Sequence, residues 1–300
     1  MSTLYGRSYF LEVGDEGEVL RLTSDFGEPA RVVFNVAIMA DGLQSLAQIS
    51  VFGLGRESRG KVYEQYNRVK LSAGYLDNTA LIFDGRIQNV SIGRDGAETF
   101  VTMYCNSTGE EWEQSFVNRT WGGRTSAEQV IRDVAGTFGY NVELIGDFSD
   151  LPPLISGYTM QMDSKQAMRN LSKRYGFSWG VRNFQVIVAR LDTYTSEVWD
   201  ISADTGMVGS PQIRERGVDV RVKLNPRINP YDRMRLENAT SELTFNNPQA
   251  AYYPDTIGVG EYGIRSVTHS GDFYGDAWDT YIEGWLWGGR SSVAVSRTGQ

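Results

Sequence analysis

The 300-residue chain has very little cysteine and histidine, and this scarcity limits its chemistry. A single cysteine, Cys105, excludes a disulfide within the chain, and a single histidine, His269, removes most zinc sites and other histidine-rich metal sites. No run of about 18 apolar residues occurs, and the N-terminus lacks the apolar core of a signal peptide. We therefore expect a soluble protein that is made and kept in the cytoplasm, with no cofactor, no metal and no membrane partner.

Clusters of basic residues are also missing. The chain carries 37 aspartates and glutamates against 29 lysines and arginines, which gives a net charge of -8. Such a chain repels nucleic acid and anionic membranes unless a local basic patch dominates. The basic residues are spread singly, and the alternate spacing of Arg214, Arg216, Arg221 and Lys223 is typical of a solvated strand face. Stable binding of DNA is not expected.

Glycine and aromatic residues are abundant and favour β-structure. The sequence has 33 glycines, 16 tyrosines, 13 phenylalanines and 7 tryptophans, a mixture of turn formers and strand formers. From Ser8 to about Asn106, short runs alternate apolar and polar residues between glycine or aspartate turns. We expect a first β-barrel domain over residues 1–107, with a short helix at Glu57–Gln65. The predicted strands are Tyr9–Val13, Val19–Thr23, Arg31–Ile38, Ala47–Phe52, Arg68–Tyr75, Ala80–Ile92 and Thr99–Cys105.

Two helices are predicted in the middle of the chain, after a connector at residues 108–125. Ser126 and Gln129 have the spacing of a capping box before an apolar helical face, and Gly139 closes the last turn. Asp163 and Gln166 repeat this pattern, and Gly176 ends the second helix. Each helix then leads into a strand. We expect a small α/β domain over residues 126–192, with residues 151–154 crossing between its two helix-strand units.

Strand patterns return after Thr193. They predict a second β-barrel domain over residues 193–300, whose polar C-terminal tail covers residues 290–300. The expected strands are Gly217–Leu224, Tyr231–Glu237, Tyr262–Thr268 and Trp278–Trp287. The predicted fold class is therefore mainly β with a small α/β middle domain and two tube-like β-barrel domains in one chain.

Few residues could carry catalysis. Paired carboxylates could hydrolyse glycans, but acidic clusters in glycine-rich loops are usually solvated turn residues. Cys105 and His269 could form a nucleophile and base, although a lone cysteine near the end of an apolar strand is more often a small buried hydrophobe. We expect no catalytic, cofactor-binding or metal-binding residue. The acidic candidates are Glu110, Glu111, Glu113, Asp272, Asp276 and Asp279.

Two blocks near the C-terminus are explained most simply as hairpins whose turns fix the strand register. In residues 209–228, a strand begins after Pro211, the chain turns at Gly217, and the following strand ends at Pro226. Residues 264–272 end in His269, Ser270, Gly271 and Asp272, ahead of a second strand that begins at Trp278.

The same blocks resemble the C-terminal signature of phage baseplate hub proteins, the group that includes the late-control D proteins. The signature of that family begins with a segment of the form G-x-P-x-x-x-x-x-G-V-x-V, which closes at L-x-P-x-I. A strand that ends in H-x-G-D follows, and W-x-T lies downstream of it. The hairpin Leu71–Tyr75 and Ile82–Ile87 resembles the family's A-G-Y and I-F-x-G-x-I. Asn229–Tyr231 departs from the family, because a glycine turn is expected there. The matching positions are Gly74, Tyr75, Phe83, Gly85, Gly209, Pro211, Gly217, Val218, Val220, Leu224, Pro226, Ile228, His269, Gly271, Asp272, Trp278 and Thr280.

The resemblance implies a structural protein of a contractile tail baseplate, without enzyme activity. It implies a homotrimeric central hub, in which six tube-like barrels from three chains join a six-fold tail tube to a three-fold spike. The implied partners are the tail tube protein, the spike or tail-tip protein, the tape measure protein and the baseplate wedge proteins. DNA would pass transiently and non-specifically through the channel, and the protein would be assembled in the host cytoplasm into the virion tail.

Two other functions stay open from the residues alone. The first is a tail-associated glycan hydrolase that acts through Glu111 or Asp276. The second is a receptor- or carbohydrate-binding tail protein that uses an aromatic face around Trp278, Trp285 and Trp287.

Overall fold

The computed structural model describes residues 6–15, 18–25, 27–40, 44–191, 193–214, 217–236 and 260–286, and in these residues the chain is mainly β. The mainly β fold class is thus confirmed. No helix of the described residues is long and apolar enough to span a bilayer.

The N-terminal strands follow the predicted alternation closely. In β3, for example, Val32, Phe34, Val36 and Ile38 are buried while the residues between them face outward. All seven predicted strands and the short helix are confirmed. Their bounds are β1 Arg7–Asp15, β2 Glu18–Thr23, β3 Val32–Met39, β4 Leu46–Phe52, α1 Arg56–Glu64, β5 Arg68–Tyr75, β6 Asn78–Asp95 and β7 Glu98–Asn106.

The middle of the chain contains both predicted helices. The Ser126 hydroxyl accepts a hydrogen bond from the Gln129 amide at 3.2 Å, and the Asp163 carboxylate accepts one from the Gln166 amide at 3.0 Å. Gly176 ends the second helix with a φ of 68°, the left-handed conformation that favours glycine. The elements are α2 Glu111–Gln114, β8 Phe116–Trp121, α3 Ala127–Gly136, β9 Asn141–Ile145, β10 Tyr158–Asp163, α4 Ser164–Tyr175, β11 Phe177–Arg182 and β12 Gln185–Arg190.

One strand lies where the sequence indicated a connector, and a second strand, β10, follows the crossing predicted at residues 151–154. β8 falls inside residues 108–125, and it pairs antiparallel with β10 in a sheet of its own. The three-stranded sheet β11-β12-β9 holds the strands that follow the helices. Alternation in β8 is weak, since Val117 and Trp121 are its only buried residues, and this explains why the pattern did not reveal a strand.

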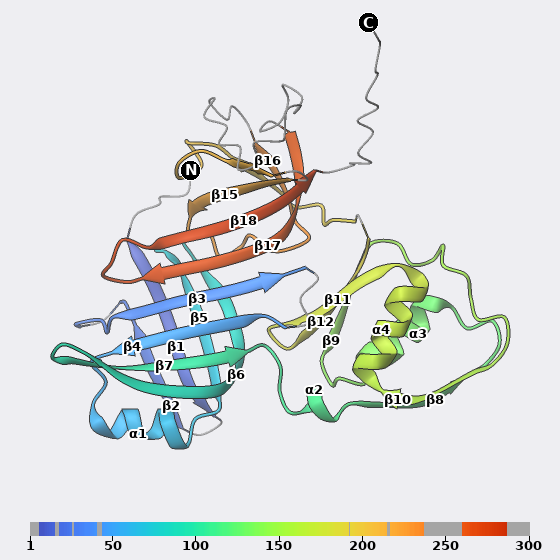
Figure 1. The fold of residues 1–300 in the computed structure, drawn as a ribbon, viewed down its shortest axis with the longest axis horizontal. Coiled ribbons are helices and arrows are strands. Elements are labelled where there is room, and N and C mark those ends of the chain that lie inside the picture. Colours follow the sequence, from blue (N-terminus) through green and yellow to red (C-terminus); the bar gives the residue numbers. More distant parts are fainter. Residues whose placement is uncertain are drawn as a thin grey trace, which may run out of the picture.

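The C-terminal strands join the N-terminal strands in one sheet. β17 pairs with β3 over residues 266–272 and 33–39, so the order is β14-β15-β18-β17-β3-β4-β7-β6-β5-β1-β2, and β13 and β16 pair beside it. Figure 1 shows β17 between β18 and β3, with β4 on the other side of β3. The described strands do not close into a barrel. The elements are β13 Val198–Ile201, β14 Gln212–Arg214, β15 Gly217–Lys223, β16 Arg233–Leu236, β17 Gly260–Asp272 and β18 Trp278–Leu286.

Four apolar clusters hold these layers together. The largest lies inside the curved N-terminal sheet and includes Leu224 and Trp278 from the C-terminal region. A second fills the middle unit, and a third lies under β15, β17 and β18. The fourth is small and joins the middle unit to the main sheet through Ala40, Ile187, Ala189 and Tyr231. The middle unit is therefore attached by few apolar contacts.

Candidate functional site

Gly271 lies where β17 packs on β3, and only glycine fits there. A Cβ atom at this position would lie 2.4 Å from Phe34 Cζ and 2.8 Å from Trp278 Cε3. Both rings are buried, with their centroids 5.3 Å apart in an edge-to-face arrangement. The motif glycine thus makes room for two aromatic rings at the contact between the two ends of the chain.

Trp278 fastens the C-terminal hairpin to β5. Its indole Nε1 donates a hydrogen bond to the Gly74 carbonyl oxygen at 2.9 Å, and the Arg7 guanidinium lies 5.5 Å from its ring centroid. Tyr75, the next motif residue, is buried beside Gly74. Because Trp278 is only 2% exposed, it does not belong to an exposed aromatic face of the kind considered above. Trp287 lies outside the described residues.

Asp272 organises the turn between β17 and β18. Its Oδ1 accepts hydrogen bonds from the amides of Tyr274 and Gly275, and both carboxylate oxygens accept from Arg31, at 3.1 and 2.7 Å. Hydrogen bonding to Arg31 is the main cause that holds the pKa of Asp272 below its usual value. Arg7 donates to the Asp272 carbonyl oxygen at 2.9 Å. The carboxylate is therefore fully used in holding the turn.

His269 is completely buried in β17. Its Nδ1 lies 2.9 Å from the Thr280 hydroxyl, whereas Nε2 has no hydrogen-bond partner. Burial lowers the pKa of His269 to about 4, so the ring is neutral at pH 7. This neutral, buried imidazole of β17 contacts Thr280 of β18, and we interpret it as a structural group.

Cys105 and His269 are separated by two intervening strands. The register places them in one row across the sheet, with His269 opposite Val36, Val36 opposite Ala47, and Ala47 opposite Cys105. Three strand spacings amount to about 14 Å. Burial also raises the pKa of the Cys105 thiol to about 12. These two residues cannot act as a nucleophile and its base, and the prediction of a buried small hydrophobe at Cys105 is confirmed.

The acidic candidates are dispersed, and several form ion pairs. Glu110 pairs with Arg86 at 2.6 Å, and Glu113 with Lys165 at 2.7 Å. In the other cluster, Arg221 lies 2.6 Å from the buried Asp279 carboxylate. Glu111 accepts a weak hydrogen bond from Tyr140, and Asp276 is exposed at the turn after β17. Nowhere in the described ranges do three histidine, cysteine or acidic side chains gather as metal ligands would.

The other motif residues serve close packing elsewhere in the sheet. A Cβ on Gly85 would lie 2.2 Å from the Asn106 carbonyl oxygen, and one on Gly217 would lie 2.0 Å from the Gly284 carbonyl oxygen. Phe83 is fully buried in the N-terminal core. Pro211 and Pro226 are both buried. The structure thus brings Gly74, Tyr75, His269, Gly271, Asp272, Trp278 and Thr280 together around the C-terminal hairpin, and Gly217 pairs with its strand β18.

Tyr231 joins three parts of the chain, a role that the departure from the family at Asn229–Tyr231 did not indicate. Its hydroxyl donates a hydrogen bond to the Ala40 carbonyl oxygen and lies 3.0 Å from the Ser178 hydroxyl, while its amide donates to the Ile264 carbonyl oxygen. Its φ is 73°, a conformation that favours glycine. The glycine-type turn expected at Asn229–Tyr231 is therefore present, but it is made by a tyrosine.

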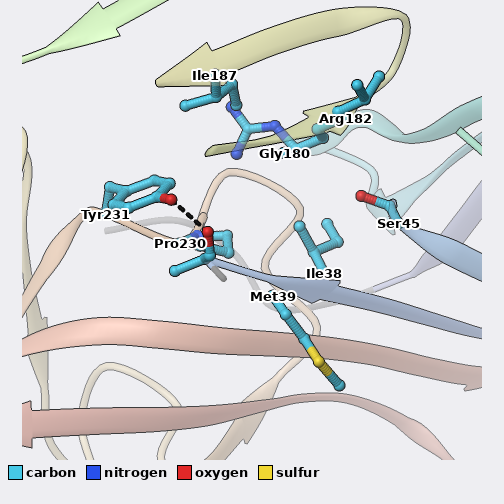
Figure 2. Close-up of a pocket in the computed structure, with 10 residues that line it drawn as sticks. Ile38, Met39, Ser45, Gly180, Arg182, Ile187, Pro230 and Tyr231 are labelled. Carbon is cyan, nitrogen blue, oxygen red and sulfur yellow. Dashed lines mark hydrogen bonds between the residues drawn. The ribbon is translucent and has the colours of Figure 1, made fainter. Parts of the chain in front are cut away.

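A small pocket opens beside Tyr231, between the end of β3 and the sheet of β11 and β12 (Figure 2). Its cavity of about 20 Å³ has room for roughly one water molecule. Arg182 lines it and is neither fully buried nor exposed. Burial lowers the pKa of Arg182, against the opposing influence of Glu143 and Asp232. The lining residues are Ile38, Met39, Ala40, Ser45, Gly180, Val181, Arg182, Ile187, Pro230 and Tyr231.

The middle of the outer face of the sheet over β17, β3, β4 and β7 carries no charge, and the charged residues Asp272 and Glu98 lie at one end of it. On β3, the side chains between the buried positions belong to Asn35, Ala37 and Met39. Register places polar or apolar uncharged residues beside them on each neighbouring strand. We call this surface the uncharged face. It consists of Ser266, Thr268, Ser270, Asn35, Ala37, Met39, Leu46, Gln48, Ser50, Tyr104 and Asn106, and the buried Thr102 lies among them.

Comparison with known proteins gives one family match. The sequence model of a family described as "Baseplate hub gp41" matches residues 12–242. No curated protein sequence matches the chain.

Solved structures share the fold at low sequence identity. The 43 kDa tail protein of prophage MuSo2 from Shewanella oneidensis aligns with a TM-score of 0.57 at 9% identity, covering 93% of this chain and 98% of that one. A tail protein from Neisseria meningitidis MC58 aligns with a TM-score of 0.58 at 7% identity, covering 94% and 98%. The E. coli c3393 protein, a component of the type VI secretion system, aligns with a TM-score of 0.54 at 9% identity, covering 92% and 76%.

Proposed function

Because this chain belongs to the baseplate hub gp41 family, we propose that three copies of it form the central hub of a contractile tail baseplate. The chain is a structural component of the baseplate, located in the virion tail, and it associates with other tail proteins. In our proposal the hub joins the six-fold tail tube to the three-fold spike and encloses part of the DNA channel.

Symmetry is the physical reason for this arrangement. Three chains with two tube-like β units each, residues 1–107 and 193–300, would present six units to a six-fold tube. The middle unit, residues 126–192, and the connector, residues 108–125, would lie outside that ring. The β17–β3 pairing supports this layout, because it holds the two β segments of one chain side by side. A closed ring of this kind requires one interface that repeats around the axis.

The observation that carries the channel proposal is the uncharged face. Double-stranded DNA carries one negative charge per about 1.7 Å of its axis, so lysine or arginine on a channel wall would retain it. The uncharged face presents hydroxyls, amides and a few apolar side chains on four adjacent strands, in a chain with 22% charged residues. We propose that this face lines the bore and lets DNA slide past without binding.

Substitution of one row of the uncharged face tests the channel proposal. Ser270, Asn35 and Gln48 lie opposite one another on β17, β3 and β4. Changing all three to lysine should leave particles intact by electron microscopy but slow DNA release, and added salt should reverse the delay. Changing the same three to glutamate is the matched control and should not slow release. Loss of assembly in both variants would instead identify the face as a subunit contact.

We further propose that the chain carries no hydrolase of its own and that its direct partners are the tail tube, spike, tape measure and wedge proteins. We propose that assembly with them takes place in the host cytoplasm. Ion pairs at Glu110, Glu113 and Asp279 support a structural role for these carboxylates. Zymography on peptidoglycan tests the absence of hydrolysis, and clear lysis by the purified chain would contradict it.

A further inference from the structure

Arg182 ends β11, and among the described residues its guanidinium has no acceptor. No hydrogen bond or ion pair joins it to any residue in the part of the chain that the structure describes. Figure 2 shows the side chain reaching across the pocket beside Ile187. Guanidinium groups have five N–H donors, and a partly buried one without an acceptor leaves a charge uncompensated, which is unfavourable.

The two carboxylates whose charge acts on Arg182, Glu143 and Asp232, already accept hydrogen bonds from other groups. Glu143 accepts a hydrogen bond from Gln185 at 3.0 Å. Asp232 accepts from Thr195, Trp199 and the Asn229 amide, at 2.8, 3.1 and 3.0 Å. Against the lowering by burial, the negative charges of Glu143 and Asp232 raise the pKa of Arg182 through space, without a hydrogen bond to it. The pocket therefore has a fixed cation and space in front of it.

The size of the pocket limits what could enter. Sites for separate small molecules are usually several hundred cubic ångströms, whereas this cavity is about 20 Å³. It admits only the end of a side chain. A carboxylate matches the planar fork of a guanidinium and forms two parallel hydrogen bonds with it. The group that suits this pocket is thus the end of an aspartate or glutamate.

We propose that the pocket receives an aspartate or glutamate side chain from a second copy of this chain, which pairs with Arg182 when the hub assembles. This inference rests on the proposed function. Copies of the chain carry a surplus of acidic residues, 37 against 29 basic ones, and so can supply the carboxylate. Met39 connects the two surfaces, because it lines the pocket, belongs to the uncharged face and is 59% exposed. The contact lies at the edge of the proposed channel wall, where the next subunit of a ring must meet it.

Cross-linking in an Arg182→Lys variant identifies the carboxylate directly. A carbodiimide couples an amine to a carboxylate in contact with it but does not couple a guanidinium. We expect a new amide between position 182 and an acidic residue, formed between chains when ¹⁴N- and ¹⁵N-labelled copies are mixed. An amide formed only within one chain, for example to Asp41 just beyond the described end of β3, would overturn the inference. So would the absence of any new amide.

Arg182→Met provides the second test, because it keeps an apolar stem of similar length and removes the charge. The isolated variant should unfold at the same temperature as the wild type or higher, since an unpaired charge is lost. Its self-association, measured by sedimentation over a range of concentrations, should weaken at least tenfold. If self-association is unchanged, the proposed contact between Arg182 and a second copy is wrong, while the hub proposal remains. A wild-type chain that stays monomeric at every concentration and is present once per tail by mass would contradict the hub itself.

Discussion

Arg31 and Asp272 are 241 residues apart in the chain, yet they form a two-pronged ion pair with distances of 3.1 and 2.7 Å. The pair ties the start of β3 to the turn between β17 and β18. It also connects the two β segments of the chain at the end of the strands that they share.

Replacing Asp272 with asparagine should destabilise the fold by about 1–3 kcal/mol at pH 7, because Arg31 loses a charged acceptor. The pKa of Asp272 is lowered in the fold, so its contribution is present above its ordinary pKa and is lost as the pH falls through the folded value. The wild type and Asp272→Asn should therefore converge in strongly acidic solution. Urea unfolding at a series of pH values measures this, and a difference that stays constant down to pH 2 would contradict it.

His269 should give a second acid transition at higher pH. Its pKa falls from about 6.5 when unfolded to about 4 in the fold. The neutral ring therefore stabilises the fold above pH 6.5, and this stability is lost as the pH falls toward 4. The loss amounts to roughly 3 kcal/mol. In His269→Asn, which cannot titrate, stability should change less between pH 6.5 and 4, although it is lower at pH 8. Equal slopes in this window would show that His269 is not the titrating group.

Gly271→Ala should destabilise the protein by about 1–3 kcal/mol, because the new methyl group would overlap the Phe34 and Trp278 rings. Gly60→Ala is the matched control. It lies in helix α1 with nothing within 4 Å of the added methyl group, and it should stabilise the protein by about 0.5–1 kcal/mol. Thermal unfolding compares the two variants. Similar effects at both sites would mean that close ring packing does not require the motif glycine.

Tyr231 should control how firmly the middle unit is held. Tyr231→Phe leaves the Ala40 carbonyl oxygen without this donor and should cost about 1–3 kcal/mol. Tyr231→Gly relieves the positive φ but empties part of the small fourth cluster. Hydrogen exchange in β11 and β12 should become faster in both variants and more so in the glycine variant. Exchange that rises equally throughout β1 and β5 would indicate global rather than local loosening.

The sequence was most informative where a pattern is local. Alternation identified β3 and β5 almost to the residue, and the serine and aspartate caps located α3 and α4 correctly. The sequence was uninformative where the structure depends on which distant strands pair with each other. Nothing near Phe116–Trp121 shows that this segment pairs with β10, and nothing near His269 shows that its strand lies against β3.

For the candidate site, the sequence identified some of the residues but not the residues that they contact. The resemblance pointed to Gly271, Asp272 and Trp278, which do meet at the C-terminal hairpin. Their partners, Arg31 and Gly74, come from distant segments and could be found only in the fold. Arg182 escaped notice because a lone arginine at a strand end has no distinctive pattern, and Asn229–Tyr231 stood out only as a departure from the family's glycine turn.

The pairing of β17 with β3 also has a consequence for biosynthesis. During translation, β3 leaves the ribosome more than two hundred residues before its neighbour β17 is made. Its backbone hydrogen-bonding groups on that side stay exposed in the interval and could pair with another nascent chain. Completion of the central sheet must therefore wait until β17 has been synthesised, so a product truncated before β17 would offer an open edge prone to aggregation.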